Sequence, residues 1–213
     1  MRRLLLLALA ASSTGAAAGD FYAGAGLPGV FVGYAQAIGD SIVVRTDVAT
    51  IGTLNRSRLH DGLDYDGRLK ANRVGVFVDS FLTRGFRLTG GLTLNDARLD
   101  LAGRGDGGTI RIGNQTYVAG PDDRFDVSAR FPRAMPYIGL GHGRHPSGAT
   151  GWSVVFDLGL SIGKPKVTGQ ASGPLLTNTV AQSDIEQQLQ KFRDDASNVI
   201  GIPQVSLAVS YRF

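Results

Sequence analysis

Two histidines and a serine in the last third of the chain are the residues whose types best suit catalysis. His142, His145 and Ser147 lie close together, and Asp157 is the nearest carboxylate downstream of them. A histidine can activate a serine for acyl transfer when a carboxylate orients its ring. The same two histidines could bind a metal ion, but no third ligand lies near them, so we expect no metal site. His60 stands alone.

A second set of polar residues lies in segments where polar and apolar residues alternate. In a closed sheet whose apolar residues face lipid, these residues face the interior, where opposite charges pair through charge-assisted hydrogen bonds. Eight strands leave room inside for side chains but not for a wide water channel. We therefore predict a polar network that fills the interior and whose side chains satisfy one another's hydrogen bonds. The alternative is a path for protons or small ions. Its members are Arg45, Asp47, Arg73, Asp79, Arg87, Asn95, Asp157 and Arg212.

The elements that must position these side chains are strands. In residues 204–213 every odd position is apolar or aromatic and every even position is small or polar, which is the period of a β-strand with two different faces. Segment 152–162 repeats the pattern with one exception, Val155. Weaker copies bring the count to eight, at 21–26, 30–34, 42–48, 74–79, 86–95 and 136–142. Leu99 and Leu101 reverse the parity of the fifth segment, which indicates a bulge or the membrane boundary.

The connections between these segments separate a barrel from a soluble sandwich. Short connections are expected at 39–40, 83–85 and 145–151, and long ones near 52–66, 102–132 and 164–198, so that the two kinds alternate. Outer-membrane barrels have short periplasmic turns, longer outside loops and an even strand number. We therefore expect an all-β fold, an eight-stranded antiparallel up-and-down transmembrane β-barrel with the long connections outside.

The start of the chain and its composition agree with export. Residues 1–19 have the charged start, apolar middle and small-residue exit of a signal peptide, which leaves 20–213 as the barrel domain. Removing Arg2 and Arg3 lowers Lys+Arg from 22 to 20 against 18 acidic residues, so the charge gives little support to nucleic-acid binding. Cysteine is absent, which excludes a disulfide-stapled fold.

One helix is expected in the last long connection, at about 183–195. Ser183-Asp184-Ile185-Glu186 has the form of a capping box, and Ile185, Leu189 and Phe192 form one apolar stripe. We expect this helix to pack on the rim of the barrel, with a lid or partner-binding helix as the alternative.

Three groups of residues carry resemblances to known proteins. The end of the chain, Val205 to Phe213, resembles the C-terminal signature of outer-membrane barrels, in which the terminal strand is read by the assembly machinery; Tyr211 and Phe213 are the matching aromatic residues. Segment 136–141, segment 151–159 and the acidic helix resemble a group of small proteobacterial outer-membrane proteins related in architecture to OmpA, OmpX and OmpW. His145-Pro146-Ser147 is similar to the catalytic pair of lipid A deacylases, but the family's continuation after the serine is missing. The alternation of short and long connections also places Ser147 in a short periplasmic turn, whereas the acyl chains of lipid A lie in the outer leaflet.

These observations predict a monomeric protein of a Gram-negative cell outer membrane, without cofactor or catalytic activity, that has a structural or surface-interaction role. The alternatives are an OmpW-like conduit for small hydrophobic compounds and a deacylase-type enzyme. The expected partners are the assembly machinery, membrane lipid and lipopolysaccharide, the last through outside arginines. Those arginines are Arg56, Arg58, Arg104, Arg111 and Arg124. Arg104-Gly105-Asp106 has the sequence of an adhesion tripeptide, but this sequence also occurs by chance in charged, glycine-rich loops.

Overall fold

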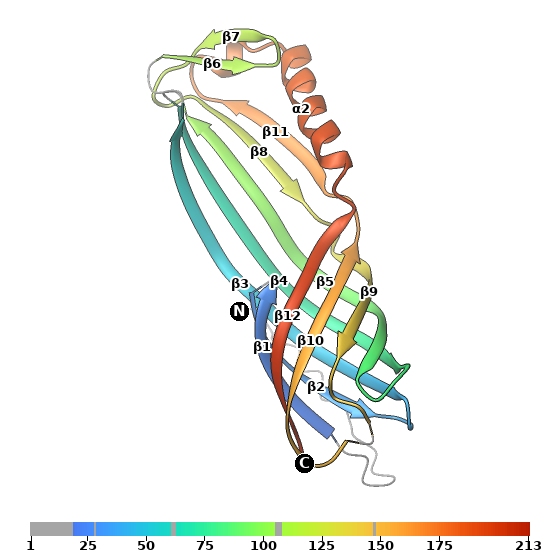
Figure 1. Cartoon of the computed structure of the whole chain (residues 1–213). Helices are drawn as coiled ribbons and strands as arrows, with labels where there is room; N and C mark the ends of the chain where they lie inside the picture. Colours follow the sequence, from blue (N-terminus) through green and yellow to red (C-terminus); the bar gives the residue numbers. More distant parts are fainter. Residues whose placement is uncertain (1–18, 28, 61–62, 105–107, 147) are drawn as a thin grey trace, which may run out of the picture.

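Antiparallel strands make up almost all of the protein (Figure 1). The computed structural model describes residues 19–27, 29–60, 63–104, 108–146 and 148–213. The predicted signal peptide therefore lies, except for Gly19, outside the described residues. The strands are β1 (Gly19–Leu27), β2 (Gly29–Ala37), β3 (Ile42–His60), β4 (Leu63–Phe81), β5 (Phe86–Arg104), β6 (Thr109–Ile112), β7 (Gln115–Val118), β8 (Arg124–Arg130), β9 (Ala134–His142), β10 (Gly151–Ile162), β11 (Lys166–Ser172) and β12 (Gly201–Arg212). The helices are α1 (Leu176–Thr179) and α2 (Gln182–Ser197).

Ten strands belong to one up-and-down sheet with the order β11-β8-β5-β4-β3-β2-β1-β12-β10-β9. A further pairing joins β5 to β9, from Phe86 opposite His142 to Leu94 opposite Ala134. The lower halves of β3, β4 and β5 thus form one wall with β1, β2, β9, β10 and β12, and we call these segments the wall. Within the described ranges, no helix is long and apolar enough to cross a membrane.

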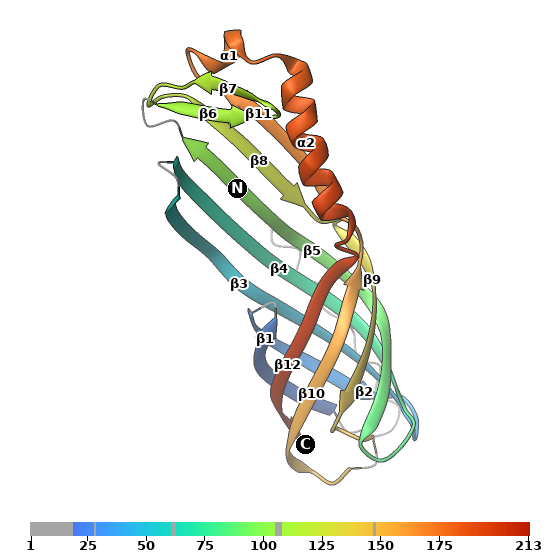
Figure 2. The same cartoon turned by 45° about the horizontal axis from the view of Figure 1, so that its top comes forward.

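The upper halves of β3, β4 and β5 continue past the wall, where β8 pairs with β5 and β11 pairs with β8 (Figure 2). We call this part the upper sheet. Three predictions are corrected here, because 52–66, 102–132 and 164–198 are not simple loops. The first is the extension of β3 and β4, the second contains β6, β7 and β8, and the third contains β11 and both helices. The turn between β1 and β2 is short although it lies at the same end of the wall as the long connections, so loop lengths at that end are mixed.

The wall and the upper sheet differ in which strand face is apolar: the outer face in the wall and the inner face in the upper sheet. On β5, Thr93 and Asn95 are buried on the inner face, whereas Leu92 and Leu94 are exposed on the outer face. Beyond Asp96 the inner face carries apolar residues, although the register between β4 and β5 continues without a shift. The reversal at Leu99 and Leu101 is therefore a boundary between two environments, and not a bulge in β5. The register shift on this side of the sheet lies in β3, between Thr50 and Gly52.

Helix α2 and the β6–β7 hairpin pack against the inner face of β8 and β11 in the upper sheet. Leu189 is buried there in a cluster with residues of the hairpin and of β8 and β11, such as Ile112, Phe125 and Val167. The apolar stripe of the helix is confirmed in this contact, but its predicted cap is wrong. The helix begins at Gln182 after Ala181, with no side-chain cap, and the carboxylate of Asp184 instead accepts a hydrogen bond from the Tyr117 hydroxyl. The additional short helix α1 precedes it.

Candidate functional site

The centre of the wall holds a cluster of two arginines and two aspartates. Each carboxylate contacts both guanidinium groups: Asp79 lies 3.0 Å from Arg45 and 3.2 Å from Arg87, and Asp157 lies 3.1 Å from Arg45 and 2.6 Å from Arg87. The four side chains come from β3, β4, β5 and β10, and Thr89 donates a further hydrogen bond of 2.7 Å to Asp79. All five residues are buried. Buried charges need such pairing, because removal from water is costly for an isolated ion.

A second group lies toward the upper sheet and combines one ion pair with neutral hydrogen bonds. Arg73 contacts Asp47 at 2.7 Å and also donates to Gln204. Gln204 in turn donates to Ser161 at 2.6 Å, and the Tyr22 hydroxyl donates to Asp47 at 3.2 Å. The amide of Asn95 bonds to the hydroxyl of Thr93 at 2.9 Å, and that hydroxyl lies 3.0 Å from the Ser161 hydroxyl. The interior is thus linked by hydrogen bonds across opposite sides of the wall.

A third group lies at the end of the wall where the chain terminates. Arg212 forms a two-point contact with Asp20, at 2.6 and 2.9 Å, and also donates to the carbonyl oxygens of His145, Pro146 and Gly148. Arg144 lies 3.9 Å from Asp20 and places its guanidinium over the Tyr22 ring at 4.2 Å.

Sequence reasoning missed several members of these groups. The period of β1 could have found Asp20, because Asp20 and Tyr22 share the inward parity of that strand. Arg144 lies in a turn at a positive φ of 58°, where no periodic signal exists. All eight residues of the predicted network are buried, but they fall into separate groups. Arg45, Arg87, Asp79 and Asp157 meet at the centre, Arg73, Asp47 and Asn95 lie in the group above them, and Arg212 lies below.

Aromatic rings fill the remaining space. The Phe77 ring lies 4.6 Å from the guanidinium carbon of Arg45 and 5.5 Å from that of Arg73, and it meets the Tyr137 ring edge-on at 4.8 Å. A cavity of about 20 Å³ remains beside these side chains, lined among others by Phe77, Tyr137 and Asp157. This volume is close to that needed by a single water molecule.

The histidines and the aspartate of the candidate catalytic group have other contacts in the part of the chain that the structure describes. His142 is exposed at the end of β9, the His145 ring packs edge-on against Phe81 at 5.0 Å, and Asp157 belongs to the arginine cluster. Ser147 and the Gly105-Asp106 part of the adhesion tripeptide lie outside the described residues. In the part of the chain that the structure describes, no three His, Cys, Asp or Glu residues are grouped so that they could hold a metal ion. Arg56, Arg111 and Arg124 are exposed on the upper part of the protein; Arg58 and Arg104 lie in the upper ends of β3 and β5.

The outer surface of the wall is an apolar belt. Outward side chains such as Val32, Val76, Leu92, Val154 and Leu207 are about half exposed. Aromatic residues collect near the chain end, where Trp152 contacts Tyr211 at 5.0 Å between ring centroids and Phe21 stacks with Phe213 at 5.7 Å. An apolar outer belt, a polar interior and an aromatic girdle are the arrangement of strands that cross a bacterial outer membrane. The fold and its interior thus define a small outer-membrane β-barrel protein.

Comparison with known proteins agrees with this class. No family model and no curated protein matches the chain. Among solved structures, CarO of Acinetobacter baumannii is 18% identical with a TM-score of 0.55, over 92% of this chain and 97% of that one. CarO2 of the same organism is 17% identical with a TM-score of 0.59, over 92% and 98% of the two chains. The chain therefore has the fold of these outer-membrane barrel proteins.

Proposed function

We propose that the chain is a monomeric eight-stranded barrel of the outer membrane, with a plugged interior and a structural or surface-interaction role. The pairing of β5 with β9 supports closure, because it links the two ends of the eight-strand wall. One observation carries the plugged interior: the Arg45–Asp79–Arg87–Asp157 cluster and the Phe77 ring occupy the centre of the wall, and the cavity beside them has a volume of about 20 Å³. A path for ions would need a continuous aqueous lumen.

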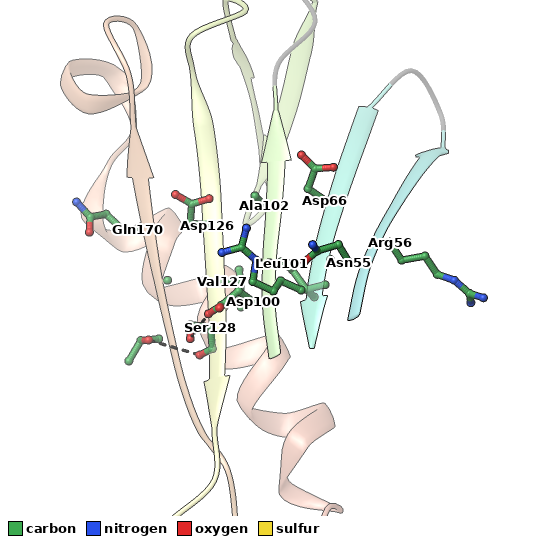
Figure 3. Close-up of a pocket in the computed structure, with 14 residues that line it drawn as sticks. Asn55, Arg56, Asp66, Asp100, Leu101, Ala102, Asp126, Val127, Ser128 and Gln170 are labelled. Atoms are coloured by element: carbon green, nitrogen blue, oxygen red, sulfur yellow. Dashed lines mark hydrogen bonds between the residues drawn. The ribbon is translucent and has the colours of Figure 1, made fainter. Parts of the chain in front are cut away.

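The upper sheet supports a role at the cell surface. Its outer face is polar and carries a hollow of about 590 Å³, lined by charged residues of neighbouring strands such as Asp66, Arg68, Asp100 and Asp126 (Figure 3). The surface is built on paired strands and not on a set of loops, and α2 and the β6–β7 hairpin pack against the other face of β8 and β11. A surface of this kind suits contact with an external macromolecule better than catalysis.

Electrophoresis and conductance test the two parts of this proposal. A folded barrel resists detergent until it is boiled, so the membrane fraction should contain a band that shifts on boiling. The purified protein in a planar bilayer should be electrically silent, whereas the variant Phe77→Ala, Tyr137→Ala, which empties the lumen of two rings, should conduct. A soluble protein without a band shift would overturn the barrel, and wild-type conductance would favour a conduit.

The absence of catalysis has its own test. Overexpression should leave the acylation of lipid A unchanged in mass spectra. Loss of an acyl chain in cells with the wild type, but not in cells with Ser147→Ala, would instead establish the deacylase activity.

A further inference from the structure

A row of four basic residues crosses the outer face of the upper sheet. Lys70 of β4 pairs in register with Arg98 of β5, Arg98 pairs with Arg130 of β8, and Arg130 pairs with Lys166 of β11. Paired residues of neighbouring strands point to the same face, and the strands lie about 4.8 Å apart, so the row extends over roughly 14 Å. We call these four residues the cationic row.

The cationic row is unfavourable for the sheet alone. Like charges placed directly opposite each other on neighbouring strands destabilise the pairing. Asp96 contacts Lys70 at 2.6 Å and Asp100 contacts Arg98 at 2.6 Å, so two of the four charges have a carboxylate partner. Arg130 and Lys166 are exposed and have no ion pair with any residue that the structure describes. The row therefore carries an excess of positive charge that an external anion would relieve.

A hollow lies at the row. Its volume is about 530 Å³, and its lining includes Lys70, Arg98, Arg130 and a fifth basic residue, Arg133. Asp96 is the one carboxylate of this lining. The space is comparable to that of sites for small organic ligands. It can therefore hold a headgroup and not only a bare ion.

The distance of the cationic row from the apolar belt, along the membrane normal, indicates which kind of anion can reach it. Leu94, an exposed apolar residue of the belt, lies four positions before Arg98 on the same face of β5. Ile162, the last residue of β10, is also an exposed apolar residue, and Lys166 begins β11 after a connection of three residues. Four residues of strand span about 13 Å, and a strand tilt of about 40° reduces this distance to roughly 10 Å along the membrane normal. The row thus lies where lipid headgroups begin.

We propose that the cationic row binds the two phosphates of a phosphorylated glycolipid headgroup in the outer leaflet. Arginine binds phosphate oxygens through charge-assisted, often two-point hydrogen bonds. One phosphate can contact two neighbouring cations, whereas a row of four over roughly 14 Å fits two phosphates held on one headgroup. This inference rests on the proposed function, because it needs the apolar belt to lie in an outer membrane.

The test compares lipids that differ only in phosphate. The full-length protein, folded in a neutral detergent, is titrated with lipid A that carries both phosphates, with the same lipid after removal of both phosphates, and with phosphatidylglycerol. The dissociation constants are obtained by native mass spectrometry. The wild type should bind the bisphosphorylated lipid at least about tenfold more tightly than either comparison lipid. Added salt should weaken that preference because the contacts lie at the surface.

Two variants and a matched control test whether the preference for bisphosphorylated lipid A depends on the cationic row. Arg98→Gln, Arg130→Gln should lose about tenfold in affinity for bisphosphorylated lipid A, and Lys166→Gln should lose less. Arg84→Gln should change nothing, since Arg84 is also exposed but lies in the turn between β4 and β5, at the opposite end of the wall from the row. In lipid-free detergent the double variant should unfold at the same urea concentration as the wild type or a higher one, because the removed repulsion offsets the loss of the solvent-accessible Arg98–Asp100 pair.

Equal binding of the three lipids, or an unchanged affinity in the double and Lys166→Gln variants, would overturn the inference. Tighter binding of phosphatidylglycerol than of lipid A would also overturn it. These failures differ from a failure of the proposed function, because a protein that keeps its band shift on boiling is still a barrel.

Discussion

Arg87 of β5 and Asp157 of β10 meet at 2.6 Å inside the wall, although 70 positions separate them in the sequence. Arg87 has no exposed surface, and Asp157 also contacts Arg45. A charge in such a place is stable only with its partner, so the interior depends on the pairing and not on either residue alone.

The first prediction concerns this pair. Asp157→Asn keeps the shape of the side chain but leaves Arg45 and Arg87 with one carboxylate between them, and should lower the free energy of unfolding by about 3 to 5 kcal/mol. Urea unfolding of the detergent-folded protein measures the change. The control is Asp96→Asn, which breaks the exposed pair with Lys70 and should cost less than about 1 kcal/mol. Equal effects of both substitutions would contradict the central role of the cluster.

The second prediction concerns two glycines that accommodate a tyrosine. Gly139 and Gly159 are opposite each other on β9 and β10, and a Cβ atom at Gly159 would lie 2.1 Å from the Tyr137 hydroxyl oxygen. Gly159→Ala should therefore displace the Tyr137 ring and destabilise the protein by about 1 to 3 kcal/mol. In a Tyr137→Leu background the same substitution should cost clearly less. Additive costs in the double-mutant cycle would show that the two residues do not interact.

The third prediction separates assembly from stability at the end of the chain. Phe213 and Phe21 stack at 5.7 Å, and both are exposed on the outer surface. Either Phe213→Ala or Phe21→Ala removes the ring contact. If the assembly machinery reads the terminal aromatic residue, only Phe213→Ala should strongly reduce the amount of folded protein in cell membranes. Equal losses would assign the role of Phe213 to packing.

The fourth prediction concerns pH and the top of the upper sheet. Asp123 accepts backbone hydrogen bonds from Gly120, Leu175 and Leu176. Desolvation raises the pKa of this carboxyl, but the three donors outweigh it and leave the pKa below its usual value. The stabilisation is therefore present above the unfolded pKa and is lost as the pH falls through the lower folded pKa.

Limited proteolysis measures that effect. The wild type should become more sensitive in residues 119–130 and 172–180 only below about pH 4, near the pKa of an unperturbed aspartate. Asp123→Ala should be sensitive there already at neutral pH and should show little further change on acidification. A wild-type sensitivity that does not depend on pH would contradict the role of the carboxylate.

The sequence by itself determined the faces of the strands. Alternation within segments 42–48, 74–79, 86–95 and 152–162 assigns each side chain to the inside or the outside without knowledge of the neighbouring strand, since the period of a strand is two. For this reason Arg45, Asp79, Arg87 and Asp157 could be placed inside from their positions alone. The apolar stripe of α2 was equally readable, because it depends on residues within one helix.

Only the tertiary structure decided which of these residues meet. Contacts between β3, β4, β5 and β10 depend on strand order and register, which distant segments set together. The same reason explains the missed upper sheet: polar and charged segments such as 53–60 pair as strands because a neighbouring strand supplies their hydrogen bonds. The cationic row is a further case, since Lys70, Arg98, Arg130 and Lys166 are scattered along the chain and become neighbours only through the register of four strands.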